Sequence, residues 1–438
     1  PCQEILDKAK EENVDIIGLS GLITPSLEEM SYVASQMEKQ QFTVPLLIGG
    51  ATTSKMHTAV KIAPQYSGPV IQVRDASLAV QVCRNLISPQ QKDSFIKDVK
   101  SEYESLRKKH ELTARQQDLL TIDLSRKRRL RIDIDTHPPV KPKKTGITVF
   151  DNYSINELSS YIDWTFFFKA WEIKGQYPSL LDDSEEGRQA AKLLDDAHAM
   201  LSTIINQNLL RTSGVIGFFP ANSTDTDDIE IYSDESRSSV ISVIHCLRQQ
   251  TIKNENQPNI SLCDFLAHKS SITDYIGLFA VSAGEGVEEL AASYEKNNDS
   301  YSALMVKILA DRLSEAFAER LHELVRKQYW GYARDENLEI RDLLRVRYRG
   351  IRPAPGYPAC PDHSEKKQIF ELLKVKESTG ISLTESFMMQ PAASVCGYYF
   401  AHPDSRYFAL GKIGDDQIRD YAIRKGISEK EVRRWIGV

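Results

Sequence analysis

The chain has 438 residues, a formal net charge of −6, and 41% hydrophobic and 26% charged residues. This length exceeds one ordinary hydrophobic core, so two domains are expected, and the composition is that of a soluble globular protein. No apolar run is long enough to cross a bilayer, and the negative charge provides no basic field for nucleic acid. We therefore expect neither a membrane nor a nucleic-acid partner.

The six cysteines are scattered along the chain without a CxxC spacing. A chain of this size needs no disulfides, so reduced thiols and a cytoplasmic location are expected. Residues 1–10 are polar and helix-like, unlike a secretory or mitochondrial leader. A chain that starts within a helix suggests a segment of a longer polypeptide.

Residues 1–88 alternate short apolar runs with amphipathic segments, which predicts an α/β domain. The runs at residues 14–20, 45–50 and 69–73 are too apolar on both faces for half-exposed strands. We therefore expect part of a Rossmann-like, doubly wound parallel sheet.

Small residues follow each of these runs, at Ser20, at residues 49–53 and at residues 75–77. In parallel α/β sheets, ligands bind at the carboxyl ends of the strands. Neither a GxGxxG nor a P-loop spacing is present, which disfavours a nucleotide-binding protein of this fold. A ligand site and a set of plain tight turns both remain open, since Gly and Ser are common in such loops.

Residues 89–147 contain a charged helix, expected at residues 98–109, a basic segment at residues 125–131 and several prolines. This composition predicts a solvated, extended linker that can act as a hinge between two domains. A basic docking patch is the alternative interpretation.

Residues 148–438 mix helices with hairpin-like strands, which predicts an α+β domain with an antiparallel sheet and surrounding helices. A long helix is expected at residues 301–329, because its large apolar side chains form one stripe. Two further helices are expected at residues 416–425 and after the stop at Gly426. Strands are expected at residues 214–219, 229–232, 239–244, 275–281, 398–400 and 407–410, the last two joined by a turn at residues 402–405.

The segment at residues 352–361 has four prolines within ten residues. Proline fixes φ, so such a loop is stiff and loses little entropy on binding. Arg352 can hold a carboxylate, Gly356 allows the backbone to approach a ligand, and Tyr357 offers an aromatic face. The segment is predicted to form one wall of a ligand site, with a plain proline-rich connector as the alternative.

A metal or nucleophile site at Cys360 and His363 is not expected. A single Cys-x-x-His lacks the second pair of ligands that a tetrahedral metal site needs. No base with an orienting partner can be named for a thiolate mechanism either.

Residues 18–30, 45–54 and 57–61 resemble the later half of the cobalamin-binding domain of the cobalamin-dependent methionine synthase family. The resemblance covers essentially the whole chain. It implies a C-terminal part of a cobalamin-binding domain at residues 1–88, a charged helix and linker at 89–147, and an activation domain at 148–438. The strings that resemble the activation domain are residues 161–164, 227–232, 247–250, 352–361 and 384–386.

The resemblance implies a methyltransferase of methionine biosynthesis, which transfers a methyl group from 5-methyltetrahydrofolate to homocysteine through cobalamin. In this family the activation domain binds S-adenosylmethionine and supports reductive remethylation of oxidised cobalamin. A flavoprotein of the methionine synthase reductase or flavodoxin type supplies the electron. Because the cofactor carries the chemistry, no catalytic side chain is expected here. The alternative is a docking module for the flavoprotein without a ligand site of its own.

The family's cobalamin-ligating histidine loop and its homocysteine, zinc and folate modules would precede Pro1. They are therefore expected in N-terminal modules of the same polypeptide, and no metal ligand is assigned within this chain.

Position by position, the resemblance assigns two binding sites to this sequence. Carboxylates can attract the ammonium or sulfonium group of S-adenosylmethionine, an arginine can hold its carboxylate, and aromatic rings can pack on adenine. The residues implied for that ligand are Asp163, Glu315, Arg352, Tyr357, Tyr407 and Phe408. The residues implied for the buried nucleotide tail of cobalamin are Ser20, Thr24, Gly49 and Ala76.

Overall fold

The computed structural model describes residues 2–21, 25–50, 52–73, 76–116, 119–182 and 185–437. The chain forms two compact units. The small unit comprises Pro1–Leu119 together with Glu429–Val438, and the large unit comprises Leu120–Ser428. None of the helices in the described ranges is long and apolar enough to cross a membrane.

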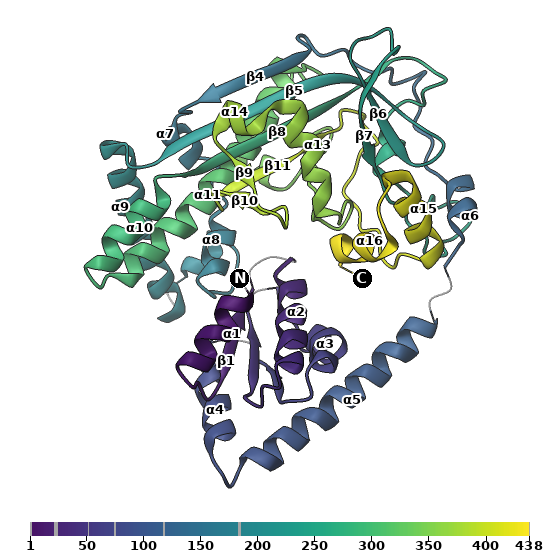
Figure 1. The fold of residues 1–438 in the computed structure, drawn as a ribbon. Coiled ribbons are helices and arrows are strands. Elements are labelled where there is room, and N and C mark those ends of the chain that lie inside the picture. Colours follow the sequence, from purple (N-terminus) through teal and green to yellow (C-terminus); the bar gives the residue numbers. More distant parts are fainter. Residues whose placement is uncertain are drawn as a thin grey trace. The chain divides into compact units, whose positions relative to one another are not determined.

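The small unit contains a three-stranded parallel sheet in the order β1-β2-β3, which confirms the predicted parallel strands (Figure 1). The strands are β1 (Ile17–Ser20), β2 (Leu46–Gly49) and β3 (Val70–Gln72). The helices of this unit are α1 (Cys2–Glu11), α2 (Pro25–Lys39), α3 (Lys55–His57), the π-helical η1 (Thr58–Ile62), the 3₁₀ turn η2 (Ala63–Gln65), α4 (Ala76–Ile87), α5 (Lys92–Gln116) and α16 (Glu429–Ile436).

Both faces of this small sheet are buried. Leu46 and Ile48 of β2 belong to the apolar cluster that α1 and α2 share, whereas Leu47 belongs to the cluster formed with α4 and α5. Successive side chains of a strand point to opposite faces, so β2 must be apolar at every position. This explains why the strand is a continuous apolar run in the sequence.

The large unit is built on a six-stranded antiparallel sheet in the order β11-β8-β5-β6-β7, with β4 paired to β5 (Figure 1). Its strands are β4 (Gly146–Asp151), β5 (Arg211–Ser223), β6 (Asp228–Tyr232), β7 (Val240–His245), β8 (Asp274–Glu285) and β11 (Ser394–Tyr399), and a separate short pair is β9 (Ser382–Leu383) with β10 (Met389–Gln390).

Helices cover both faces of the large sheet. In β8, Phe279 and Val281 belong to the core under the long helix α11, and Leu278 and Ala280 belong to the core under α13 and α14. This arrangement confirms the predicted α+β domain. The helices are α6 (Ile122–Lys127), α7 (Ile155–Ser159), α8 (Trp164–Ala170), η3 (Ser179–Leu181), α9 (Glu185–Gln207), η4 (Leu262–Phe265), α10 (Val287–Lys296), α11 (Ser300–Leu324), η5 (Val325–Tyr329), α12 (Ile340–Leu344), η6 (His363–Glu365), α13 (Lys366–Leu373), α14 (Val375–Thr379) and α15 (Asp415–Lys425).

The predicted hairpin between residues 398–400 and 407–410 is wrong in its second strand. The turn at residues 402–405 is present, with a hydrogen bond from the Ser405 N–H to the His402 carbonyl (3.0 Å). One side of β11 pairs with β8, and the other is occupied where the Tyr398 N–H donates to the Pro353 carbonyl (2.9 Å). The contact with Pro353 therefore takes the place on β11 at which the predicted second strand would pair.

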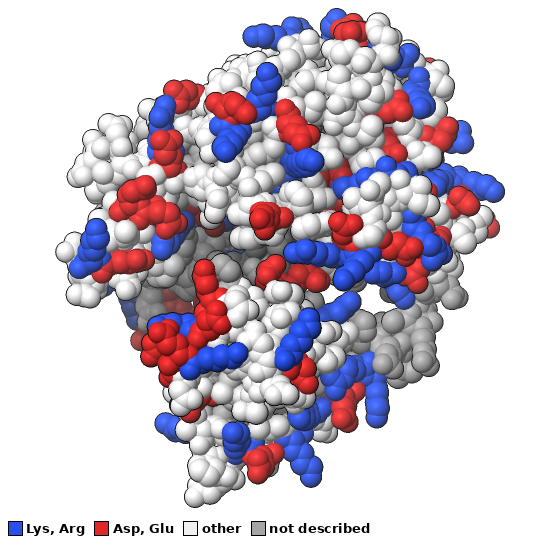
Figure 2. Space-filling model, viewed as in Figure 1, with Lys and Arg blue, Asp and Glu red and all other residues white. Residues whose placement is uncertain are grey.

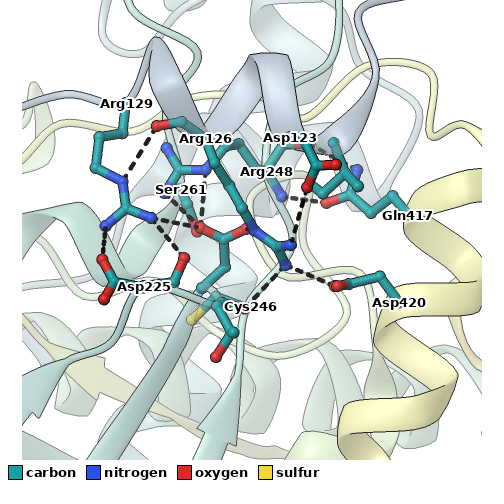
Figure 3. A network of polar contacts seen from close by, with 12 residues as sticks. Asp123, Arg126, Arg129, Asp225, Cys246, Arg248, Ser261, Gln417 and Asp420 are labelled. Carbon is teal, nitrogen blue, oxygen red and sulfur yellow. Dashed lines mark hydrogen bonds and ion pairs between the residues drawn. The ribbon is translucent and has the colours of Figure 1, made fainter.

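The basic segment at residues 125–131 is not a solvated, extended hinge. Arg126 contacts the carboxylates of Asp227 (2.9 Å) and Asp420 (2.7 Å), and the Arg129 guanidinium donates to the Asp225 carbonyl (2.7 Å) (Figure 3). The side chains of Arg126 and Arg129 are only 16% and 19% exposed. A buried carboxylate such as Asp227 needs positive partners, and the basic segment supplies them to the large unit.

Candidate functional site

The predicted cobalamin-binding residues lie at the carboxyl edge of the small parallel sheet. Ser20 and Gly49 are directly paired at the ends of β1 and β2, Ser20 is exposed, and Ala76 is the first residue of α4. Thr24 lies outside the described residues. A Cβ added to Gly49 would meet only ordinary van der Waals contacts, the nearest at 3.5 Å. The described part of this edge therefore presents small residues.

The neighbouring Gly50 is required by the fold of the edge. Its φ is +102°, and an added Cβ would stand 2.2 Å from the Gly21 carbonyl oxygen. A side chain at Gly50 would therefore force the two strand-end loops apart. The tight turn thus accounts for Gly50, whereas a Cβ could be accommodated at Gly49.

In the large unit, a cavity of about 450 Å³ lies against the proline-rich loop at residues 352–361. Its volume is in the range typical of small-molecule sites. Segments far apart in the sequence meet here, namely β8, α11, the loop, β11 and residues 407–409. The lining residues are Phe279, Glu315, Arg352, Pro353, Ala354, Tyr357, Pro358, Ala359, Val395, Tyr407, Phe408 and Ala409. Five of the six residues predicted for S-adenosylmethionine are among them.

The proline-rich loop is held in one shape by backbone contacts. Gly356 has a φ of +99°, and its N–H donates to the Cys360 carbonyl (2.7 Å). A Cβ at Gly356 would stand 2.3 Å from the ring of His363. Leu410 donates its N–H to the Pro358 carbonyl (3.0 Å), which fixes residues 407–410 beside the loop. The wall is therefore preorganised, as the prolines predict.

Arg352 lies on this wall with three polar attachments. Its Nη2 is 2.7 Å from Oε2 of Glu319, and its Nη1 donates to the Tyr348 hydroxyl (2.7 Å). Its backbone N–H donates to the Tyr407 hydroxyl (3.0 Å). Sequence reasoning missed Glu319 and Tyr348. The available signal for Glu319 was its spacing, one helical turn after Glu315 on the same face of α11.

The rest of the cavity combines a carboxylate with exposed aromatic surface. The negative charge of Glu315 is the first cause that raises the pKa of Tyr357 to about 12, with burial second. Tyr357 is 56% exposed and Tyr407 is 45% exposed, so both rings are accessible to a ligand. Aromatic faces beside a carboxylate suit a ligand that has both a positive charge and a flat ring.

Asp163 has a different local role. Its carboxylate accepts the Thr165 N–H (2.9 Å) and caps the first turn of α8, and Asp163 is not among the residues that line the cavity. A contact between Asp163 and a ligand stays a prediction.

Cys360 is buried in the protein core, and His363 contacts a lysine. Burial raises the pKa of the Cys360 thiol well above its usual range. Lys366 donates to Nδ1 of His363 (2.9 Å), and burial together with the Lys366 charge lowers the pKa of His363 to about 4. Within the described ranges, no group of three or more His, Cys, Asp or Glu residues is placed to hold a metal ion.

This chain is similar to known proteins both in sequence and in structure. Residues 154–426 match the family model described as vitamin B12 dependent methionine synthase, activation domain. The chain is also similar to a solved structure, the crystal structure of the MetH reactivation domain bound to AdoHcy, with 50% sequence identity and a TM-score of 0.71. That similarity covers 73% of this chain and 98% of the other. All residues that line the cavity fall within residues 154–426.

Proposed function

Because the chain belongs to the family of vitamin B12-dependent methionine synthase activation domains, we propose that its large unit binds S-adenosylmethionine in the cavity around Arg352. The observation that carries the proposal is the meeting of Arg352, Glu315 and four aromatic side chains around one cavity. The AdoHcy-bound reactivation domain, at 50% identity, supports an S-adenosyl ligand.

The side chains of the cavity match the parts of this ligand. The Arg352 guanidinium would hold the ligand carboxylate, and the Glu315 carboxylate would attract its positive ammonium or sulfonium group. Tyr357, Tyr407 and Phe408 would pack on the adenine ring or face the sulfonium. Asp163 would attract the ammonium group in addition to capping α8.

We further propose that the chain serves the reductive remethylation of cobalamin in an enzyme that transfers methyl from 5-methyltetrahydrofolate to homocysteine. Ser20, Gly49 and Ala76 would hold the nucleotide tail of cobalamin together with Thr24 at the carboxyl edge of the small sheet. When cobalamin is bound, it supplies the nucleophile for the methyl group. The residues of the large unit then need only bind and orient the methyl donor.

Titration of the native chain with S-adenosylmethionine in a calorimeter tests the ligand proposal. Arg352→Ala should weaken binding about tenfold or more, because a hydrogen bond to a charged group contributes about 1.5–3 kcal/mol. Arg347→Ala is the matched control, since Arg347 is 60% exposed and pairs with Asp342. Absence of binding to the native chain, or equal binding by the Arg352 variant, would rule the proposal out.

For partners, we propose an electron-donating flavoprotein of the methionine synthase reductase or flavodoxin type and N-terminal modules of the same polypeptide. Basic and acidic side chains are interspersed on the face shown in Figure 2, so docking would depend on local groups of charges. A docking module without a ligand site is the competing function, and it predicts no effect of Arg352→Ala on ligand binding. Six free cysteines support a cytoplasmic location, which we also propose.

A further inference from the structure

A buried carboxylate lies directly behind the cavity wall. Glu319 is on α11, one turn after Glu315, and its side chain is 5% exposed. Its Oε2 is 2.7 Å from Nη2 of Arg352, and its Oε1 has no hydrogen-bond partner among the residues that the structure describes. Burial of a carboxylate costs free energy unless it is paired, so Arg352 is the group that makes Glu319 tolerable at this position.

The second side-chain contact of Arg352 is itself fixed by the core. The Tyr348 hydroxyl accepts from Nη1 of Arg352, and the Tyr348 ring lies against the Arg326 guanidinium (4.2 Å) and the His322 ring (4.8 Å). Arg326 is in turn held by hydrogen bonds of 2.7 and 3.0 Å to Glu336. Contacts therefore run from the interior of the large unit to one guanidinium on the cavity wall.

These contacts restrict a side chain that is otherwise flexible. An unrestrained arginine loses rotamer entropy when it binds a ligand. Glu319 and Tyr348 remove that freedom before the ligand arrives. The Arg352 side chain nevertheless remains 18% exposed, whereas Arg248, which has a purely internal pairing, is fully buried. The pairing thus leaves part of the Arg352 side chain exposed on the wall of the cavity.

We propose that Glu319 is a positioning residue, whose buried carboxylate aims the Arg352 guanidinium at the carboxylate of the S-adenosyl ligand, with Tyr348 as the second support. This inference rests on the proposed function of the cavity. It assigns to Glu319 an effect on the amino-acid end of the ligand and none on its nucleoside end.

Two ligands separate these ends. S-adenosylhomocysteine carries the amino-acid group, and 5′-methylthioadenosine shares the nucleoside and the sulfur but has no carboxylate. Both are titrated calorimetrically into the native chain and into Glu319→Ala, Glu319→Gln and Tyr348→Phe. The matched control is Glu323→Ala, because Glu323 is a carboxylate one turn further along α11, 12% exposed and paired with Arg320 (2.8 Å), but not on the cavity wall.

We expect Glu319→Ala to weaken S-adenosylhomocysteine binding about tenfold, with less than a twofold change for 5′-methylthioadenosine. Glu319→Gln keeps a hydrogen-bond acceptor and should restore part of the loss. Tyr348→Phe should weaken only S-adenosylhomocysteine, by a smaller factor. Glu323→Ala should leave the ratio of the two affinities unchanged. If Glu319→Ala does not fold, the Gln and Phe variants decide the outcome.

Three results would overturn the inference. Equal weakening of both ligands would show that Glu319 only stabilises the fold. Unchanged ratios in the Gln and Phe variants would show that Arg352 needs no positioning. Tighter binding of S-adenosylhomocysteine by Glu319→Ala would show that Glu319 competes with the ligand carboxylate. If the native chain bound neither ligand, the proposed function would fail as well, so the two failures are distinguishable.

Discussion

Replacement of Arg248 by methionine should strongly destabilise the large unit. The Arg248 side chain, labelled in Figure 3, is fully buried. Its guanidinium contacts two carboxylates, Asp227 (2.6 Å) and Asp264 (2.6 Å), and donates to the Asn259 carbonyl (2.6 Å). Methionine has a similar length but no charge. The substitution leaves both carboxylates buried without their shared cation.

The expected loss is about 3–5 kcal/mol of unfolding free energy, the usual cost when one partner of a buried ion pair is removed. Asp227 keeps Arg126 at 2.9 Å, and Asp264 keeps the Ser261 N–H at 3.0 Å, so the lower half of that range is expected. Total stabilities of about 5–15 kcal/mol are typical, so this loss is a large share.

Urea denaturation followed by tryptophan fluorescence measures the effect, because Trp164, Trp171 and Trp330 all lie in the large unit. The control is Arg211→Met, since Arg211 is 50% exposed and its pair with Asp151 is 2.7 Å long at the surface. Such a pair contributes about 0–1 kcal/mol. A loss for Arg248→Met no larger than that of the control would refute the reasoning.

Three further outcomes are expected. Gly356→Ala should abolish most S-adenosylmethionine binding measured by calorimetry, because its Cβ would collide with His363, whereas Gly380→Ala has open space at a similar φ of +77° and should bind normally. Asp163→Ser should keep the cap of α8, which contributes about 1 kcal/mol to the unfolding free energy, but should bind S-adenosylmethionine more weakly. An unchanged affinity for S-adenosylmethionine would leave Asp163 only its capping role. Burial raises the pKa of Asp274 to about 7, so the folded chain holds this proton up to a higher pH than the unfolded chain does. The unfolding free energy of the native chain relative to Asp274→Asn should therefore fall as the pH rises from about 4 to about 7, by at most about 1.4 kcal/mol per pH unit. A difference that does not change with pH in urea titrations would contradict the shift.

The sequence by itself determined the elements whose signals are local. Apolar runs and stripes located β1, β2 and β3 and the long helix α11, because burial on both faces or on one helical face leaves a pattern within a short stretch. The proline-rich loop was likewise predictable, since proline restricts the backbone wherever it stands. Local patterns cannot say which distant segments meet at Arg352, so that assignment came from family resemblance.

Only the tertiary structure decided which segment pairs with a strand edge and which partner each buried charged side chain has. Residues 407–410 read as a strand, but the edge of β11 is taken by Pro353. The basic segment read as a solvated hinge, but Asp227 lies more than ninety residues away in the sequence and binds Arg126. Glu319 received no role from the sequence, but it pairs with Arg352 in the structure. In each case the deciding partner is remote in sequence, and the free energy of pairing a buried polar group outweighs local preference.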